Sequence, residues 1–458
     1  MVELSGEWVL VNGKKNVYFR DFNTFRNTSF KQPFMSNITI TDTLTLPCGA
    51  IIKNRIGKSA MSENMGSKGF LSNRSFHTLY GRWADGGTGL LITGNVMVDQ
   101  RALGEARNVV IEKGIHDASL KLWAEAGRKH DTHIWVQLNH PGKQSPKFLS
   151  TVPVAPSAIP LKKPLNRVFN TPRALSEEEI IDIIERFAYA AKVCKENGFT
   201  GVQIHGAHGY LVSQFLSPTH NQRTDQWGGS IENRMRFVSE IYQAIRAEVG
   251  PEFPVSIKLN SADFQKGGFT KEDSMAVVKH LSDLGMDLIE ISGGTYETPV
   301  MTGTNVKEST KLREAYFLDY CEEVRKIVKS PLMLTGGFRS SQGMNNALAT
   351  GVCDMVGIAR SLAINPDFSK ELLSGKDVTS LVKPLTTGFA FLDRTFPLEI
   401  VWYTDQIHLI GKGQDPNIHR SPLRSVLGMV WELGVNVLKK ERVSAIEAID
   451  APTPPAPT

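Results

Sequence analysis

The chain has 458 residues, of which 41% are hydrophobic and 22% are charged, a composition that supports a large folded core and excludes a disordered or fibrous protein. The net charge of +5 is small for this length and its basic residues are dispersed, so no nucleic-acid-binding surface is expected. The four cysteines are far apart, which argues against a zinc site, an iron–sulfur cluster and a disulfide framework, and predicts a reducing compartment. With acidic residues near its start and no apolar run of about 18 residues, the chain is expected to be cytoplasmic and not to span a membrane, and a membrane partner is not favoured.

Residues 1–33 precede the repeating part of the sequence and are expected to form an N-terminal extension. From about residue 50 to 375, short β-branched runs alternate with longer segments of helical period, which is typical of βαβ units in a parallel sheet. The eight predicted strands are 55–60, 89–93, 133–138, 201–205, 254–259, 287–292, 331–335 and 354–359. The clearest helices are predicted at 176–198, 230–250, 270–285 and 340–351. Eight repeats favour an α/β fold of the (β/α)₈ TIM-barrel type over 34–380, because a doubly wound sheet usually stops at five or six strands.

Residues 381–450 are expected to form a C-terminal helical extension. Within it, 421–440 begins with Ser and Pro and has apolar residues at 423, 426, 427, 430, 431 and 437, which predicts an amphipathic helix. Packing on the barrel or on a second subunit is the favoured role, so a homo-oligomer through the terminal extensions is an open possibility. Membrane-surface binding through Trp431 is the alternative. The Pro- and Ala-rich residues 451–458 are expected to form a flexible tail.

In such a barrel the chemistry lies at the carboxyl ends of the strands. The fourth strand ends with His205, followed by His208 and Tyr210. No acidic or cysteine ligand accompanies the two histidines at the usual spacing, so no metal site is predicted. Two imidazoles can instead donate hydrogen bonds to one substrate oxygen and draw electrons from a conjugated double bond, while a nearby phenol supplies a proton.

Six motifs occur in order along the repeats: KNRIGKSAMSENMG (53–66), WVQLNHPGKQS (135–145), IHGAHGYLVSQFLSPTHNQRTDQWGGSIENRMRF (204–237), ISGG (291–294), TGGF (335–338) and GIARSLAINPDF (357–368). Together they resemble the old yellow enzyme family of NADH:flavin oxidoreductases. The resemblance implies an FMN-dependent ene-reductase that takes hydride from NADH or NADPH and passes it from flavin N5 to an activated C=C bond, as in enones and nitroalkenes. It implies that His205 and His208 hold the substrate oxygen and that Tyr210 protonates the α-carbon. The His-x-x-His spacing resembles the branch whose second position is histidine.

An FMN cofactor makes three demands on such a barrel. Its phosphate needs backbone N–H donors and a cation, which Gly336, Gly337 and Arg360 offer where barrels place phosphates. Its pyrimidine edge needs an amide such as Gln137. A cation near N1 and O2 raises the reduction potential, and Lys258 is a Lys inside a strand, where the family usually has Arg. The resemblance extends the cofactor site to Ser59, Ala60, Met61, Ser62, Asn95 and Ala359, with Ser62 standing where the family has Thr or Cys to hydrogen-bond flavin O4.

Less specific interpretations stay open beside this one. Arg360 could form a surface ion pair, and Gln137 could be an inert buried amide. The substrates could be mainly quinones or xenobiotics, or Lys258 could serve a flavin-free lyase as a Schiff-base amine. The barrel could also be catalytically idle and act as a binding or scaffold protein. Relatives with an iron–sulfur cluster and a further nucleotide-binding domain are disfavoured, because 376–458 contains no cysteine and is too short for that domain.

Overall fold

The computed structural model describes residues 10–11, 14–15, 37–295, 297, 314, 317–395 and 398–438. The chain divides into two units, Met1–Met35 and Ser36–Thr458. In the first unit, two short strands, β1 (Leu10–Val11) and β2 (Lys14–Lys15), pair in antiparallel. The predicted tail at 451–458 lies outside the described residues.

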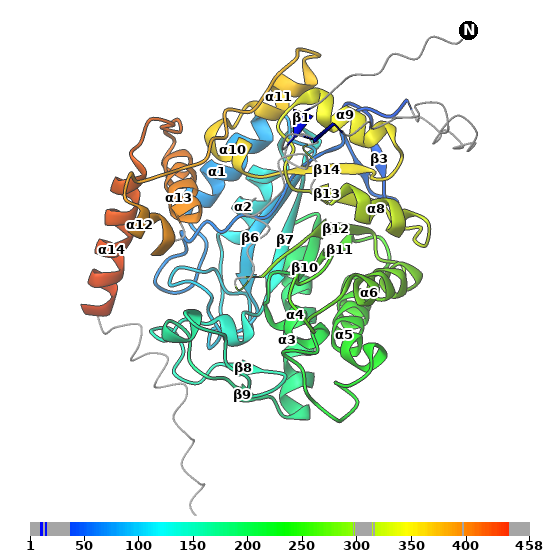
Figure 1. Cartoon of the computed structure of the whole chain (residues 1–458), viewed down its shortest axis with the longest axis vertical. Helices are drawn as coiled ribbons and strands as arrows, with labels where there is room; N and C mark the ends of the chain where they lie inside the picture. The colour runs from blue at the N-terminus through cyan, green and yellow to red at the C-terminus, as the bar shows by residue number, and fades with distance from the viewer. Residues whose placement is uncertain are drawn as a thin grey trace, which may run out of the picture. The chain divides into compact units, whose positions relative to one another are not determined.

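The second unit contains a closed barrel of eight parallel strands (Figure 1). In chain order the strands are β5 (Ile56–Lys58), β6 (Leu90–Met97), β7 (His133–Asn139), β10 (Gly201–Gly206), β11 (Val255–Asn260), β12 (Leu288–Ser292), β13 (Leu332–Thr335) and β14 (Met355–Ile358). Each predicted strand overlaps one of them, so the (β/α)₈ prediction is confirmed. The register between β6 and β7 shifts between Ile92 and Asn95, and this irregularity carries β6 four residues beyond its predicted end.

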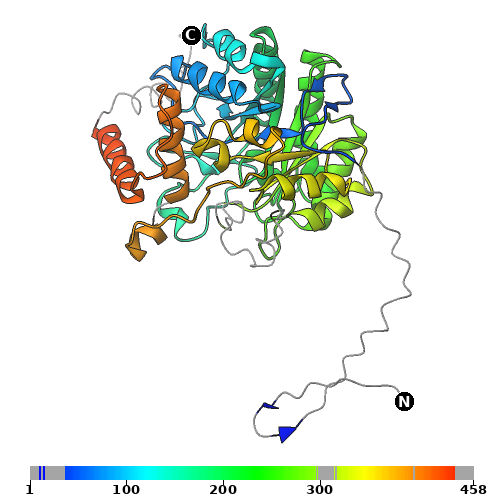
Figure 2. The same ribbon diagram turned by 90° about the horizontal axis from the view of Figure 1, so that it is seen from above.

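Helices follow the strands and surround the barrel (Figures 1 and 2). They are α1 (Arg74–Asp85), α2 (Leu120–Gly127), α3 (Glu177–Glu196), α4 (Leu211–Leu216), α5 (Ile231–Val249), α6 (Lys271–Asp283), α8 (Leu318–Arg325), α9 (Ser341–Ala349), α10 (Arg360–Ile364) and α11 (Phe368–Leu373). The four helices predicted between strands correspond to α3, α5, α6 and α9. The start of α3 is fixed by a capping box, in which Ser176 and Glu179 each bond the other's backbone N–H.

Three short helical turns and two small sheets complete the loops. The turns are η1 (Lys129–Asp131), η2 (Gly142–Gln144) and η3 (Leu165–Arg167). The sheets pair β3 (Leu44–Thr45) with β4 (Ile51–Ile52), and β8 (Val154–Ala155) with β9 (Arg173–Ala174).

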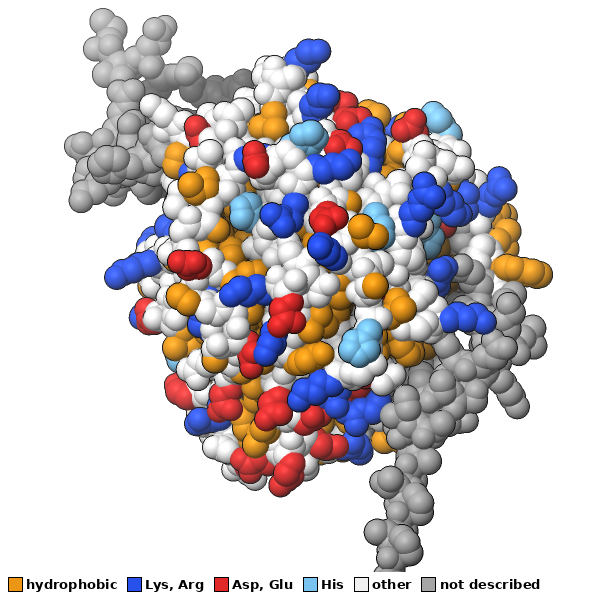
Figure 3. All heavy atoms as spheres, turned by 180° about the vertical axis from the view of Figure 1, so that it is seen from behind, with side chains coloured by type: hydrophobic (Ala, Val, Ile, Leu, Met, Phe, Trp, Pro, Cys, Tyr) orange, Lys and Arg blue, Asp and Glu red, His pale blue; other side chains and the backbone are white. Residues whose placement is uncertain are grey.

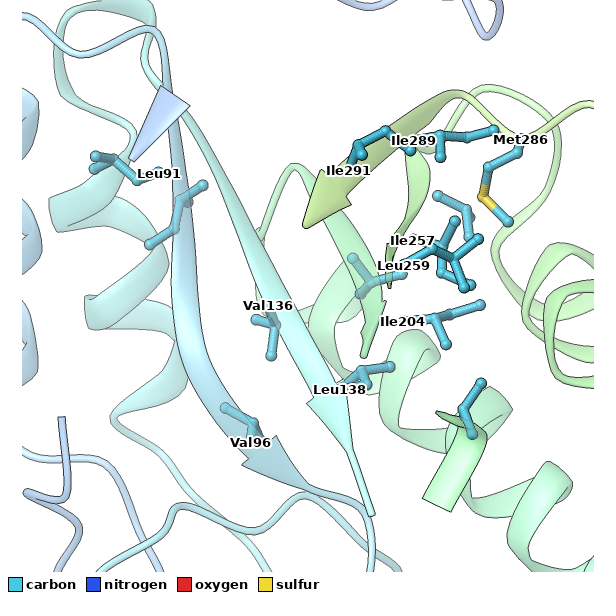
Figure 4. Packing of buried hydrophobic residues seen from close by; sticks show 14 of the residues in the cluster. Leu91, Val96, Val136, Leu138, Ile204, Ile257, Leu259, Met286, Ile289 and Ile291 are labelled. Carbon is cyan, nitrogen blue, oxygen red and sulfur yellow. The ribbon is translucent and has the colours of Figure 1, made fainter. Parts of the chain in front are cut away.

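Alternation along the strands separates two cores. Side chains that point outward, among them Leu91, Val136, Ile257 and Ile289, pack between the strands and the helices (Figure 4). Inward-pointing residues at the amino ends of the strands form a smaller apolar cluster: Leu90, Ile92, Trp135, Leu288, Met333 and Met355. The β3–β4 hairpin closes this cluster with Leu44, Leu46 and Ile52. The barrel is therefore filled at this end, and its polar inward-pointing residues lie toward the other end.

The segment after the barrel forms α12 (Ala390–Thr395), α13 (Leu398–Gly411) and α14 (Pro422–Leu438). The helix predicted at 421–440 is therefore confirmed as α14, which packs against α13. Its Val426 is buried, whereas Leu427, Val430 and Trp431 are exposed. None of the helices in the described ranges combines the length and apolar character needed to cross a bilayer. On the face seen in Figure 3, basic and acidic side chains are interspersed.

Candidate active site

A cavity of about 300 Å³ lies at the carboxyl ends of the barrel strands. It brings together all the predicted site residues except Ser59, Gly336 and Gly337: Ala60, Met61, Ser62, Asn95, Gln137, His205, His208, Tyr210, Lys258, Ala359 and Arg360. A smaller hollow of about 90 Å³ is lined by Gly336 and Gly337 and shares Ala359 and Arg360 with the cavity. Ser59 lines neither space, and its hydroxyl lies 2.9 Å from that of Thr335 inside the barrel.

The two histidines and the tyrosine form a compact group at the end of β10. The ring centroid of His205 lies 5.2 Å from that of His208 and 4.7 Å from that of Tyr210. Burial lowers the pKa of both imidazoles well below the usual range, and the charge of Lys258 lowers both further. Both rings are therefore neutral at physiological pH. Because the N–H of Ala207 donates to Nδ1 of His205, the proton of this ring lies on Nε2, where it can be donated.

The backbone of His208 is held in a conformation that non-glycine residues rarely adopt. Its φ is +61°, in the left-handed region. The amide of Gln144 donates to its carbonyl oxygen at 3.1 Å, and its own N–H donates to Oδ1 of Asn260 at 3.3 Å. The imidazole Nε2 lies 3.0 Å from the hydroxyl of Ser292 at the end of β12. Contacts from η2 and from the ends of β11 and β12 thus hold the backbone and the ring of His208.

Beneath the cavity, Lys258 is ion-paired. Its ammonium lies 2.9 Å from Oε1 of Glu290 on the adjacent strand β12, and both side chains are buried. A buried ammonium is costly unless an anion lies close to it, and Glu290 is such an anion within the chain. Gln137 also lines the cavity, and its Nε2 donates to Oε1 of Gln203 at 2.8 Å.

Ser62 lies at the cavity wall beside an acid that sequence reasoning missed. Its hydroxyl donates to Oε2 of Glu105, which also lines the cavity. Burial raises the pKa of Glu105, and the nearby charge of Glu63 raises it further. A serine hydroxyl has one hydrogen, which Ser62 donates to Glu105. In this arrangement Ser62 can therefore only accept a hydrogen bond from a ligand in the cavity. Glu105 stands alone in a loop, where no motif marks it.

The cavity is closed on one side by α13, which contributes Glu399, Ile400, Tyr403, Thr404 and Ile407. Glu399 forms an ion pair with Arg360, with 2.5 Å between Oε2 and Nη1. The ion-pair alternative for Arg360 is thus realised, but at the cavity wall and with side chains only about one quarter exposed. The sequence predicts a helical extension after the barrel and gives no signal that it reaches the site.

A second buried ammonium, also missed from the sequence, supports the segment that follows β5. Lys58 points outward from the barrel, lies 4.7 Å from the ring centre of Trp83, and donates to the carbonyl oxygen of Ile92 at 2.7 Å. Burial lowers its pKa to about 8. The adjacent carboxylate of Glu63 accepts from the Tyr80 hydroxyl and from the N–H of Gly94. This cluster fixes the chain where it enters the cavity wall.

These residues fit an FMN cofactor. Oδ1 of Asn95 is buried at the cavity without a hydrogen-bond partner among the described residues, which suits a ligand that carries N–H donors. Gln137 and Lys258 offer an amide and an ammonium to the same space. At the smaller hollow, Gly336 and Gly337 have φ of +129° and +92°, a region of backbone conformation that is open mainly to glycine. In the described ranges, no three His, Cys, Asp or Glu side chains gather as metal ligands would.

Comparisons with known proteins agree with this geometry. Residues 48–378 match the model of the NADH:flavin oxidoreductase / NADH oxidase family. The NADH-dependent flavin oxidoreductase iliE of Hypocrea jecorina is 40% identical over 357 residues, which span 73% of this chain and 89% of that protein. The NADH-dependent flavin oxidoreductase iccE of Talaromyces variabilis is 37% identical, with 75% and 88% covered. The solved structure of morphinone reductase superposes with a TM-score of 0.62 at 25% identity, covering 76% of this chain and 92% of that one.

Proposed function

Because the chain belongs to the NADH:flavin oxidoreductase / NADH oxidase family, and is thus an FMN-dependent oxidoreductase that uses NADH or NADPH, we propose that it reduces activated carbon–carbon double bonds. The observation that carries the proposal is the group formed by His205, His208 and Tyr210 at one wall of the cavity. Two neutral imidazoles beside a phenol suit an α,β-unsaturated carbonyl or nitro compound. We also propose, from the spacing of the two histidines, that the chain belongs to the branch of the family whose second position is histidine.

Each residue has a separate task in this proposal. Bound FMN supplies two-electron transfer between the nicotinamide and the substrate, chemistry that ordinary side chains lack. His205 and His208 donate hydrogen bonds to the substrate oxygen, which polarises the conjugated bond. Tyr210 holds the proton that the α-carbon receives. Gln137, Lys258 and Asn95 bind the cofactor.

The geometry speaks against the lyase alternative. Schiff-base chemistry needs a neutral amine that is free to attack a carbonyl. The nitrogen of Lys258 instead lies 2.9 Å from the carboxylate of Glu290, at the bottom of the cavity. Its position suits a fixed positive charge.

The test has a binding arm and a turnover arm. The purified protein is expected to absorb near ~450 nm as a flavoprotein, and the band is expected to shift when a phenol binds as its phenolate beside the imidazoles. His205→Ala and His208→Ala should each abolish the phenol shift and slow alkene reduction. His77→Ala is the matched control, because His77 bonds the carbonyl oxygen of Ser119 outside the cavity.

Turnover is followed anaerobically as NADH and NADPH oxidation with a cyclic enone, a nitroalkene and a quinone. Enone and nitroalkene reduction, lost in the two histidine variants but retained in His77→Ala, would support the proposal. Reduction of quinones alone would replace it with the quinone alternative. A colourless protein that does not take up FMN would overturn it.

A further inference from the structure

A layer of polar side chains lies between the apolar barrel floor and the cavity. Five members point inward from five strands, and the sixth, Ser59, directly follows β5; the strand residues are Gln137, Gln203, Lys258, Glu290 and Thr335. Gln137 and Lys258 reach the cavity, whereas Glu290 and Gln203 are fully buried beneath it and do not line it.

Glu290 is the centre of this layer. Its Oε1 accepts from the Lys258 ammonium at 2.9 Å and from the Thr335 hydroxyl at 2.7 Å, and its Oε2 accepts from Nε2 of Gln203 at 2.9 Å. A carboxylate beneath a cofactor cavity is costly to bury unless its charge is compensated. Here three donors on three different strands satisfy it.

The ionised carboxylate also sets the direction of every hydrogen bond around it, because it can only accept. Gln203 must turn its N–H groups toward Glu290, so its oxygen faces Gln137 and accepts from Nε2 of that residue. Gln137 therefore keeps its carbonyl oxygen and one N–H for the cavity. The Thr335 hydroxyl donates its single hydrogen to Glu290, so in the pair with Ser59 it must accept, and the Ser59 hydroxyl is the donor.

We propose that Glu290 is a positioning residue of the flavin site, which orients Lys258 and Gln137 and offsets part of the Lys258 charge. The inference rests on the cofactor placement proposed above. A cation beside a flavin favours the reduced, anionic form, and a carboxylate 2.9 Å from that cation weakens this effect. Glu290 thus holds the reduction potential of the bound flavin below the value that Lys258 alone would give.

The experiment measures the midpoint potential of the flavin in the purified holoenzyme by equilibration with a redox dye. Glu290→Gln keeps the size of the side chain and removes its charge. The two-electron equilibrium is expected to shift at least tenfold toward reduced flavin, a rise of about 30 mV. Lys258→Met should shift it in the opposite direction. In the Lys258→Met background, Glu290→Gln should change the equilibrium less than threefold, because Glu290 acts through Lys258.

Asp287→Asn is the matched control. Asp287 immediately precedes β12, the strand that carries Glu290, and it is buried and ion-paired with Arg246 at 2.6 Å. Its loss should lower thermal stability and leave the potential unchanged. A purely structural role for Glu290 predicts the same behaviour for both variants.

Glu290→Gln leaves a buried ammonium without its partner, so Glu290→Asp serves as the second variant. It keeps the charge, withdraws it from Lys258 by one methylene, and should shift the equilibrium in the same direction but less far. A wild-type potential in either folded variant, or an undiminished shift in the Lys258→Met background, overturns the inference. A wild-type protein that binds no flavin overturns the proposed function as well, so the two failures are distinguishable.

Discussion

Tyr210→Phe separates proton delivery from every other role of the site. Tyr210 is 7% exposed, and its ring packs against His205 with centroids 4.7 Å apart and planes at 74°. Phenylalanine keeps this packing and removes only the hydroxyl. Loss of a positioned general acid costs about 10² to 10⁴ in rate. This corresponds to about 3–5 kcal/mol in the barrier for alkene reduction.

The assay follows the flavin absorbance anaerobically in a stopped-flow instrument, one half-reaction at a time. Flavin reduction by NADH or NADPH needs no proton from Tyr210 and should stay within about twofold of wild type, while reoxidation by an enone slows by the full factor. Tyr320→Phe is the control, because Tyr320 is equally buried at 7% and its hydroxyl bonds Ser274 away from the cavity. Equal losses in both half-reactions, or an unchanged reoxidation rate, would refute the assignment.

Three further predictions concern the walls of the site and the scaffold. In Gly94→Ala the new Cβ would lie 2.5 Å from the carbonyl oxygen of Met61 and against the carboxylate of Glu63. The FMN affinity should therefore fall at least tenfold in a flavin fluorescence titration. An unchanged affinity would contradict the close packing of Gly94 against Met61 and Glu63. Burial raises the pKa of Glu105 above 4.5, so its ionisation destabilises the fold as the pH rises through the folded-state pKa. The thermal midpoint of Glu105→Gln should therefore rise relative to that of wild type from about pH 4.5 upward. A difference in midpoint that does not change with pH would contradict this. Ser176→Ala removes one half of the capping box of α3 and should cost about 1 kcal/mol of stability in denaturant unfolding, with the flavin spectrum unchanged as the check that the site is intact.

The barrel could be predicted because each strand is a short apolar run that stands out between helical segments, as 254–259 does between α5 and α6. Lys258 could be singled out as well, because a Lys inside a buried strand is costly. The partner of Lys258 could not be predicted, because Glu290 reads only as a polar residue inside another strand until the register pairs the two. The role of Lys58 could not be predicted either, because only the fold shows that its side chain points away from the barrel interior toward Trp83.

Some of the candidate site residues could be brought together from their motifs alone. His205, His208 and Tyr210 follow a strand end directly, so local sequence suffices to bring them to the cavity. Asn95 depends on the irregular register of β6, which alternation alone does not indicate. The contribution of α13 depends on contacts with α1 and α10, far away along the chain, and a helix pattern does not specify what the helix packs on.

The wall formed by α13 is separate from the loops that follow the barrel strands and carry the other cavity residues. Ile400, Thr404 and Ile407 belong to a helix that shares no backbone hydrogen bonds with the barrel ladder, so their side chains can vary without disturbing strand register. Glu399 on the same helix is ion-paired with Arg360, so it is tied to the expected cofactor site. Changes at Ile400, Thr404 and Ile407 that keep Glu399 would therefore reshape this wall of the cavity without removing the partner of Arg360.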